Sequence, residues 1–102
     1  MIKINKKYLA SFCFTLKLLD GIFRPGKIEF SESGITAYWL GSILYHLEYT
    51  DLLRVETTGR FPRWLKFVGV KDCIYVGSSY EAICIELAER EIPIIKVKKL
   101  KD

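Results

Sequence analysis

Large apolar residues recur at every second position over long stretches of this sequence, and this alternation limits its fold more than any other feature. In the stretch 8–18 the even-numbered residues are all apolar, and most residues between them are small or polar. Successive side chains of a strand point to opposite faces, so this period is typical of a strand with one buried face. A helix over the same residues would leave Phe14 and Leu18 outside its apolar stripe. We therefore predict a long strand whose buried row is Tyr8, Ala10, Phe12, Phe14, Leu16 and Leu18.

Six further segments have a strand-like pattern and are separated by turn signals such as Pro25-Gly26. A last segment near the C-terminus is predicted to form an edge strand with Ile95 and Val97 inward. Its lysines would then point outward, where they discourage association between sheets. The six segments are 27–31, 35–40, 43–49, 53–57, 64–70 and 73–76, and the last one is 94–98.

One segment follows a helical pattern instead, in which apolar residues recur every three or four positions. Ser78 and Glu81 have the spacing of a capping box, in which each side chain satisfies a backbone donor at the start of a helix. Glu86 falls on another face of this helix, and Pro93 is expected to end it. The apolar stripe consists of Tyr80, Ile83, Cys84, Leu87 and Ala88.

Two stretches resemble the pleckstrin-homology superfold, in particular its short prokaryotic and GRAM-like members. Residues 46–56, HLEYTDLLRVE, are similar to the pattern with which that family enters its second sheet. Residues 26–30, together with Gly34-Ile35, resemble its second and third strands. The resemblance covers roughly residues 12–91. It implies seven strands in a partly open antiparallel barrel or sandwich, with one C-terminal amphipathic helix closing an end.

The same resemblance bears on ligands. Members that bind phosphoinositides carry basic residues along the first strands, where this chain has Lys17, Arg24 and Lys27. Glu29 stands where a further basic residue would fall.

An internal duplication is an alternative architecture. A shift of 37 residues pairs Leu16 with Leu53 and Pro25 with Pro62, among several other matches. Two tandem βββα units would follow, the first with a helix over 43–50. A groove between the two units would then be the natural binding site.

Catalytic and metal-binding groups are not predicted. Cys13, Cys73 and Cys84 show no CxxC spacing, and with the single histidine, His46, they do not form a recognisable zinc set. The sequence contains no phosphate-binding glycine loop and no nucleophile elbow. We expect a protein that is not an enzyme and that needs no cofactor or metal.

Length and composition point to one small soluble domain over residues 1–102. The longest uncharged run, 33–47, is too short to span a bilayer, and no cleavage site follows the N-terminal apolar stretch. A cytoplasmic location is therefore expected. Glutamine is absent and asparagine occurs once, which favours a thermophilic source.

Binding is the remaining class of function. Basic and acidic blocks alternate along the chain, which argues against one continuous basic face. The loop 59–64 combines arginines with aromatic residues, a combination enriched at protein interfaces, although Phe61 and Trp64 could also fold inward. We expect a module that binds a protein or peptide through a sheet edge or an aromatic groove, with a homodimer possible. The alternative is a weak, salt-sensitive binder of nucleic acid or anionic lipid. The candidate partner-binding residues are Arg60, Phe61, Arg63, Trp64, Tyr45 and Tyr49, and the candidate anion-binding residues are Lys17, Arg24, Lys27 and Lys66.

Overall fold

The structure, a computed structural model, describes residues 5–14, 24–60 and 63–100. Within these ranges it contains eight strands and one α-helix, which confirms the prediction of a mainly β fold with one C-terminal helix. The predicted positions 15–18 of the first strand lie outside the described residues. The strands are β1 (Lys6–Cys13), β2 (Arg24–Phe30), β3 (Gly34–Trp39), β4 (Ser42–Glu48), β5 (Leu52–Thr57), β6 (Leu65–Gly69), β7 (Cys73–Gly77) and β8 (Ile94–Lys96), with the helix α1 at Tyr80–Glu89 and a 3-10 turn, η2, at Tyr49–Asp51.

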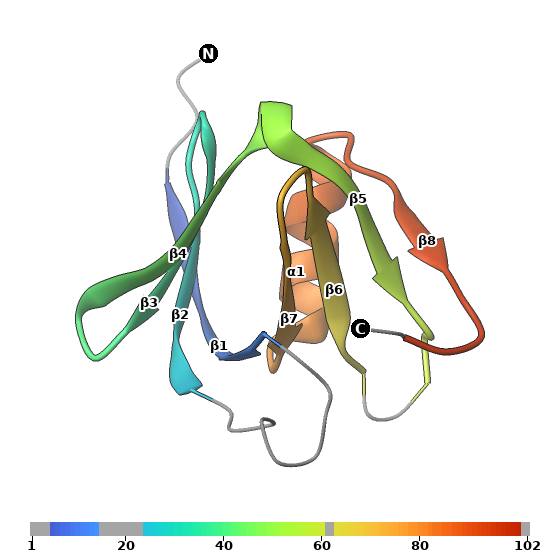
Figure 1. Cartoon of the computed structure of the whole chain (residues 1–102), viewed down its shortest axis with the longest axis horizontal. Helices are drawn as coiled ribbons and strands as arrows, with labels where there is room; N and C mark the ends of the chain where they lie inside the picture. The colour runs from blue at the N-terminus through green and yellow to red at the C-terminus, as the bar shows by residue number, and fades with distance from the viewer. Residues whose placement is uncertain (1–4, 15–23, 61–62, 101–102) are drawn as a thin grey trace.

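All eight strands belong to one open sheet in the order β4-β3-β2-β1-β7-β6-β5-β8. Every pair is antiparallel except β5 with β8, so the sheet is mixed. Figure 1 shows β1–β4 on one side of the molecule and β5–β8 on the other, with α1 behind β6 and β7. The sheet is therefore strongly bent around its core.

Most of the core consists of the inward rows that the alternation predicts, but the first strand is shorter than predicted. β1 ends at Cys13, which is fully buried, and Phe14, predicted to point inward, is 39% exposed. Because the chain leaves the sheet after Cys13, the alternation no longer sets the direction of the Phe14 side chain. In β1, Tyr8 packs against the core, and Ala10 and Phe12 are buried within it, whereas Leu9 is 69% exposed. These rows are present in both halves of the bent sheet. They therefore pack against α1 and against each other inside the bend. The buried apolar residues include Ile28, Phe30, Ile35, Ala37, Val55, Leu65, Phe67, Ile74, Val76, Ile83 and Leu87.

The helix is present where it was predicted, but its start and its rotation differ from the prediction. Ser78 and Ser79 have φ values of 69° and 51°, and Ser79 makes no side-chain capping bond. A capping residue normally has extended backbone, and the sharp turn out of β7 prevents that geometry, so the capping box is wrong. The stripe is also rotated, because Ala88 is exposed while Glu86 is buried. Among the described residues, no helix is long and apolar enough to cross a membrane.

The duplicated architecture is wrong. Its first helix would cover 43–50, but β4 occupies Ser42–Glu48 and pairs with β3 along its whole length. The reason is local, since Leu40 and Gly41 both have positive φ and reverse the chain into a tight hairpin. The chain that leaves this turn is already in register with β3, so it continues as a strand.

The prediction of which β8 side chains point inward is also wrong. Ile94 packs against the core, whereas Ile95 is 44% exposed. The parallel register with β5 places Ile94 beside the fully buried Val55, and this pairing decides which side chain points inward.

Candidate functional site

The loop predicted to bind a partner is tied to the molecule at several points. The Arg60 guanidinium donates a hydrogen bond to the Lys98 carbonyl oxygen at 2.6 Å. Arg63 lies 3.5 Å from a carboxylate oxygen of Glu81 and 5.6 Å from the centre of the Tyr80 ring. Phe61 lies outside the described residues.

Trp64 is half-buried, and its ring packs against the backbone of β7. A Cβ atom built on Gly77 would lie 2.3 Å from Trp64 Cζ3, so the glycine leaves room for the ring. Much of the tryptophan surface is therefore already used within the fold.

The two candidate tyrosines point to different neighbours. Tyr45 Oη donates to Asp72 Oδ1 at 2.5 Å, and Tyr49 Oη donates to the Ser31 carbonyl oxygen at 2.9 Å. Burial, and then the hydrogen bond to Asp72, raise the pKa of Tyr45. Burial also raises the pKa of Tyr49.

The candidate anion-binding residues do not form one patch. Lys66 is 8% exposed, and its ammonium nitrogen lies 5.5 Å from the centre of the Tyr75 ring. Lys27 is exposed on the outer face of β2, and Lys17 lies outside the described residues.

Arg24 belongs to an aromatic cluster that the sequence did not predict. Its guanidinium carbon lies 5.5 Å from the centre of the Trp39 ring and 5.8 Å from that of Phe14. The rings of Phe14 and Tyr45 meet edge to face with their centres 5.9 Å apart. The cluster joins the residue that follows β1 to β2, β3 and β4, and it extends from Trp39, beside the tip of the β3–β4 hairpin, to Tyr45 in the middle of β4.

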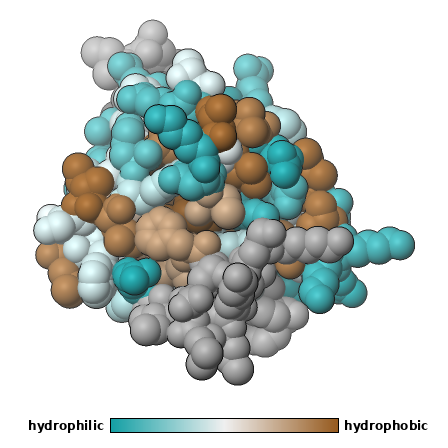
Figure 2. Space-filling model, in the orientation of Figure 1, coloured by the Kyte–Doolittle hydropathy of each residue, from teal (hydrophilic) through white to brown (hydrophobic). Residues whose placement is uncertain are grey.

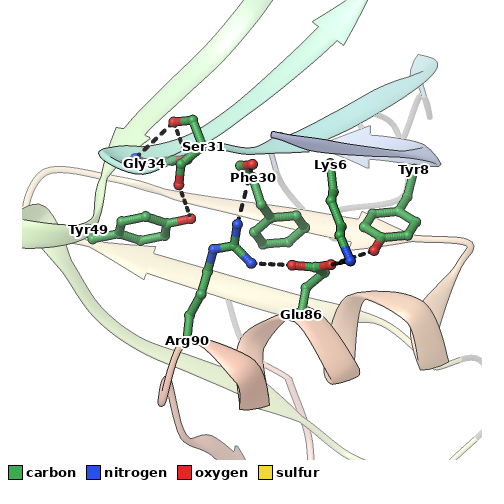
Figure 3. Close-up of polar contacts among 8 residues, drawn as sticks. All are labelled: Lys6, Tyr8, Phe30, Ser31, Gly34, Tyr49, Glu86 and Arg90. Atoms are coloured by element: carbon green, nitrogen blue, oxygen red, sulfur yellow. Dashed lines mark hydrogen bonds and ion pairs between the residues drawn. The ribbon is translucent and has the colours of Figure 1, made fainter. Parts of the chain in front are cut away.

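A buried polar cluster links α1 to the sheet (Figure 3). Glu86, 1% exposed, accepts a hydrogen bond from Tyr8 Oη at 2.6 Å and forms an ion pair with Arg90. Lys6 Nζ lies 3.5 Å from the same carboxylate, and Arg90 also reaches the Phe30 carbonyl oxygen at 3.5 Å.

The charges and pKa values of this cluster indicate a structural role. Burial acts to raise the pKa of Glu86, but the Tyr8 hydrogen bond and the charges of Arg90 and Lys6 outweigh it, so this pKa is lowered. Burial and the bond to Glu86 raise the pKa of Tyr8 to about 12. The carboxylate is thus held ionised and already surrounded by donors, which suits the positioning of α1 better than proton transfer.

The two outer strands of the sheet differ in length and sequence. β4 is the last strand at one end of the sheet and has seven residues, without proline or lysine. The strand at the other end, β8, has three residues and includes Lys96. Natural edge strands are usually short, bulged or charged to prevent unwanted pairing. β4 has a bulge opposite Ala37/Tyr38 and one charged residue, Glu48, which lies at its end.

Apolar side chains surround this edge. Ile43 is 65% exposed and Leu40, at the hairpin tip, is 82% exposed. Figure 2 shows hydrophobic side chains gathered over the β3–β4 hairpin. At the other end of β4, a pocket of about 350 Å³ lies between the strand and the β6–β7 turn, lined by Tyr45, His46, Leu47, Asp51, Val70, Lys71 and Asp72.

Comparison of the chain with protein-family models, with curated proteins and with solved structures finds no match.

Proposed function

We propose that this chain is a non-enzymatic interaction module that binds an extended segment of a partner protein along the free edge of β4. The observation that carries the proposal is the contrast between the two edges of the sheet. At one edge, β4 has seven residues, an exposed Ile43 and no further strand beside it among the described residues, whereas the edge of β5 is already covered by the three-residue β8.

Strand addition suits this geometry. An added strand would gain main-chain hydrogen bonds along β4, and its alternate side chains would contact the surfaces at the two ends. One end offers the aromatic cluster around Trp39 and Arg24, and the other offers the polar pocket beside Asp51 and Asp72. The partner would therefore be selected by side chains at both ends of the strand.

The alternative, a salt-sensitive binder of nucleic acid or anionic lipid, is less well supported. Arg60 and Arg63 have partners within the fold, and Lys66 is largely buried. These candidates also lie on separate elements, and binding to phosphates usually needs a contiguous basic surface.

The resemblance to the pleckstrin-homology superfold belongs to the same proposal. Seven antiparallel strands followed by one helix, in an open bent sheet, support it. A cytoplasmic location and a thermophilic source are likewise proposed from the composition alone.

A peptide display library of unstructured sequences tests the proposal. Ile43→Lys places a charge on the edge of β4, and Ile95→Lys does the same on the exposed edge of β8, so the second variant is a matched control. We expect Ile43→Lys to lower the affinity for the selected peptides about tenfold or more, and Ile95→Lys to leave that affinity unchanged. Equal binding by both variants would refute the proposal.

Backbone methylation of a selected peptide gives a second test. A strand offers its N–H groups alternately to the two sides, so methylation of one alternate set should abolish binding and methylation of the other should not. Sedimentation of the protein alone shows whether a second copy is the partner. Affinity that falls steeply between low and moderate salt would instead favour the phosphate-binding alternative.

A further inference from the structure

A second surface lies on the outer face of β1, β2 and β3, the face that points away from the core. The strand register places Leu9 beside Lys27, and Lys27 beside Tyr38, in one row across the sheet. A groove of about 700 Å³ lies over this face. Its lining includes Lys7, Leu9, Pro25, Lys27, Tyr38 and Leu40.

Leu40 is the unusual residue of this groove. It lies at the tip of the β3–β4 hairpin with φ 54°, followed by Gly41 with φ 80°. Left-handed backbone is strained for a leucine, and asparagine or glycine is the usual residue at such a turn. The side chain is also 82% exposed. In the isolated fold, leucine at this position therefore contributes neither a favourable backbone conformation nor buried apolar surface. A partner that covers Leu40 would account for both features.

The charges of the groove have one sign. Lys7 and Lys27 line it, and within the described residues neither forms an ion pair. The Lys7 ammonium lies 5.3 Å from the centre of the Tyr38 ring. Glu29 lies beside Lys7 in the strand register but is not part of the groove lining, and its carboxylate accepts hydrogen bonds from Tyr38 Oη at 2.8 Å and from the Asn5 amide at 3.3 Å. In the part of the chain that the structure describes, the lining itself has two ammonium groups and no carboxylate, which favours an acidic ligand.

The dimensions of the groove suit a helix. Three neighbouring strands span about 10 Å, which is close to the diameter of an α-helix with its side chains, about 10–12 Å. On the inner side of the sheet, α1 already packs as a helix and contributes Ile83 and Leu87 to the core.

We propose that the outer face of β1–β3 docks an acidic amphipathic helix of a partner protein. The apolar side of that helix covers Leu9 and Leu40, and its acidic residues pair with Lys7 and Lys27. The surface shares Leu40 with the β4 edge, but Lys27 lies on β2, away from that edge, so Lys27→Glu tests helix docking separately from strand addition.

The decisive variant is Leu40→Asn, because asparagine tolerates the left-handed turn better than leucine does. A display library of amphipathic helices of about 20 residues, with acidic or basic polar faces, supplies the probe. We expect acidic helices to be enriched. Leu40→Asn should lower the affinity for these helices about tenfold or more, while the melting temperature of the protein stays equal or rises. Retained folding together with lost binding separates a docking role from a structural one.

Charge reversal completes the test. Lys27→Glu should abolish binding of a selected acidic helix, and a helix with lysine in place of its acidic residues should restore it. Ile95→Lys, on the opposite edge of the sheet, is the control that should change nothing. The proposal is overturned if no acidic helix is enriched, or if the selected helices bind both variants as well as the original chain. It is equally overturned if phosphatidylserine vesicles, and not helices, bind in a manner that depends on Leu40.

Discussion

Glu86 is the residue at which the polar contacts between α1 and the first strand converge. A carboxylate that is 1% exposed costs a large desolvation free energy unless charges and donors surround it. Arg90 and Lys6 supply the charges, and Tyr8 supplies a hydrogen bond from a position 78 residues away in the chain. The cluster therefore fixes how α1 is rotated on the sheet.

Glu86→Gln is expected to lower the free energy of unfolding by about 3 kcal/mol, because it leaves the buried Arg90 beside a neutral partner. Urea unfolding measures the change. Glu89→Gln, an exposed site on the same helix, should change it by less than about 0.5 kcal/mol. Equal losses in the two variants would mean that the buried ion pair has no special role.

Tyr8 predicts how stability changes in alkali. Its pKa rises from 10.0 to about 12 on folding, so its contribution is fully present below pH 10 and is lost as the pH rises towards 12. Tyr8→Phe should therefore show a shallower loss of stability between these pH values than the original chain. Urea midpoints at a series of pH values check this, with Tyr80→Phe as the control. An unchanged slope in Tyr8→Phe would contradict the assignment.

At the scale of elements, β2 and β3 lie so close at Gly26 that no side chain fits between them. A Cβ atom on Gly26 would lie 1.8 Å from the Tyr38 carbonyl oxygen, a distance that no side chain can adopt. Because the position of a Cβ atom is fixed by its own backbone and the oxygen belongs to the backbone of β3, relief requires the β2–β3 pairing to separate. The glycine is thus needed for sheet geometry.

Gly26→Ala is expected to lower the free energy of unfolding by about 3 kcal/mol or more, since strands must move apart. Gly41→Ala is the matched comparison, because that glycine has φ +80° but nothing within 4 Å of the added atom. It should cost only about 1 kcal/mol of backbone strain. Thermal unfolding of both variants gives the order, and a larger loss in Gly41→Ala would contradict the structure.

The elements also show what the sequence could and could not predict. Strand and helix positions follow from local alternation, so β2–β7 and α1 were predicted with small errors at their ends. The burial of Glu86 depends on contacts with Lys6 and Tyr8, which no local pattern contains. The same holds for the cluster of Arg24 with Trp39, since pairing between strands brings those residues together. The turn between the predicted strands 35–40 and 43–49 was placed one residue late, because leucine is not a typical residue for the left-handed backbone that Leu40 adopts.

At the scale of the whole molecule, the two edges of the sheet differ in how they are covered. The parallel strand β8 covers the edge of β5, and the Val97 amide extends the contact by donating to the Thr57 carbonyl oxygen at 2.9 Å. The C-terminal segment therefore covers the edge of β5, and β4 remains the long outer strand at the opposite edge.

Deletion of residues 94–102 should expose the edge of β5 and cause self-association, because an uncovered edge offers unpaired backbone groups. Sedimentation velocity at increasing protein concentration measures this, and the full chain serves as the reference. A truncated chain that stays folded and monomeric at every concentration would show that β8 is dispensable as a cover.

The pairing of β1 with β7, for example Ser11 with Gly77, has a consequence for the synthesis of the chain. The first strand leaves the ribosome long before its neighbour on that side exists, so an early four-stranded intermediate would carry two unpaired edges. Contacts so distant in sequence slow folding, and nascent β-rich chains with exposed edges tend to aggregate. Completion of the sheet is therefore expected only after β7 has emerged, and newly made chains should depend on chaperones until then.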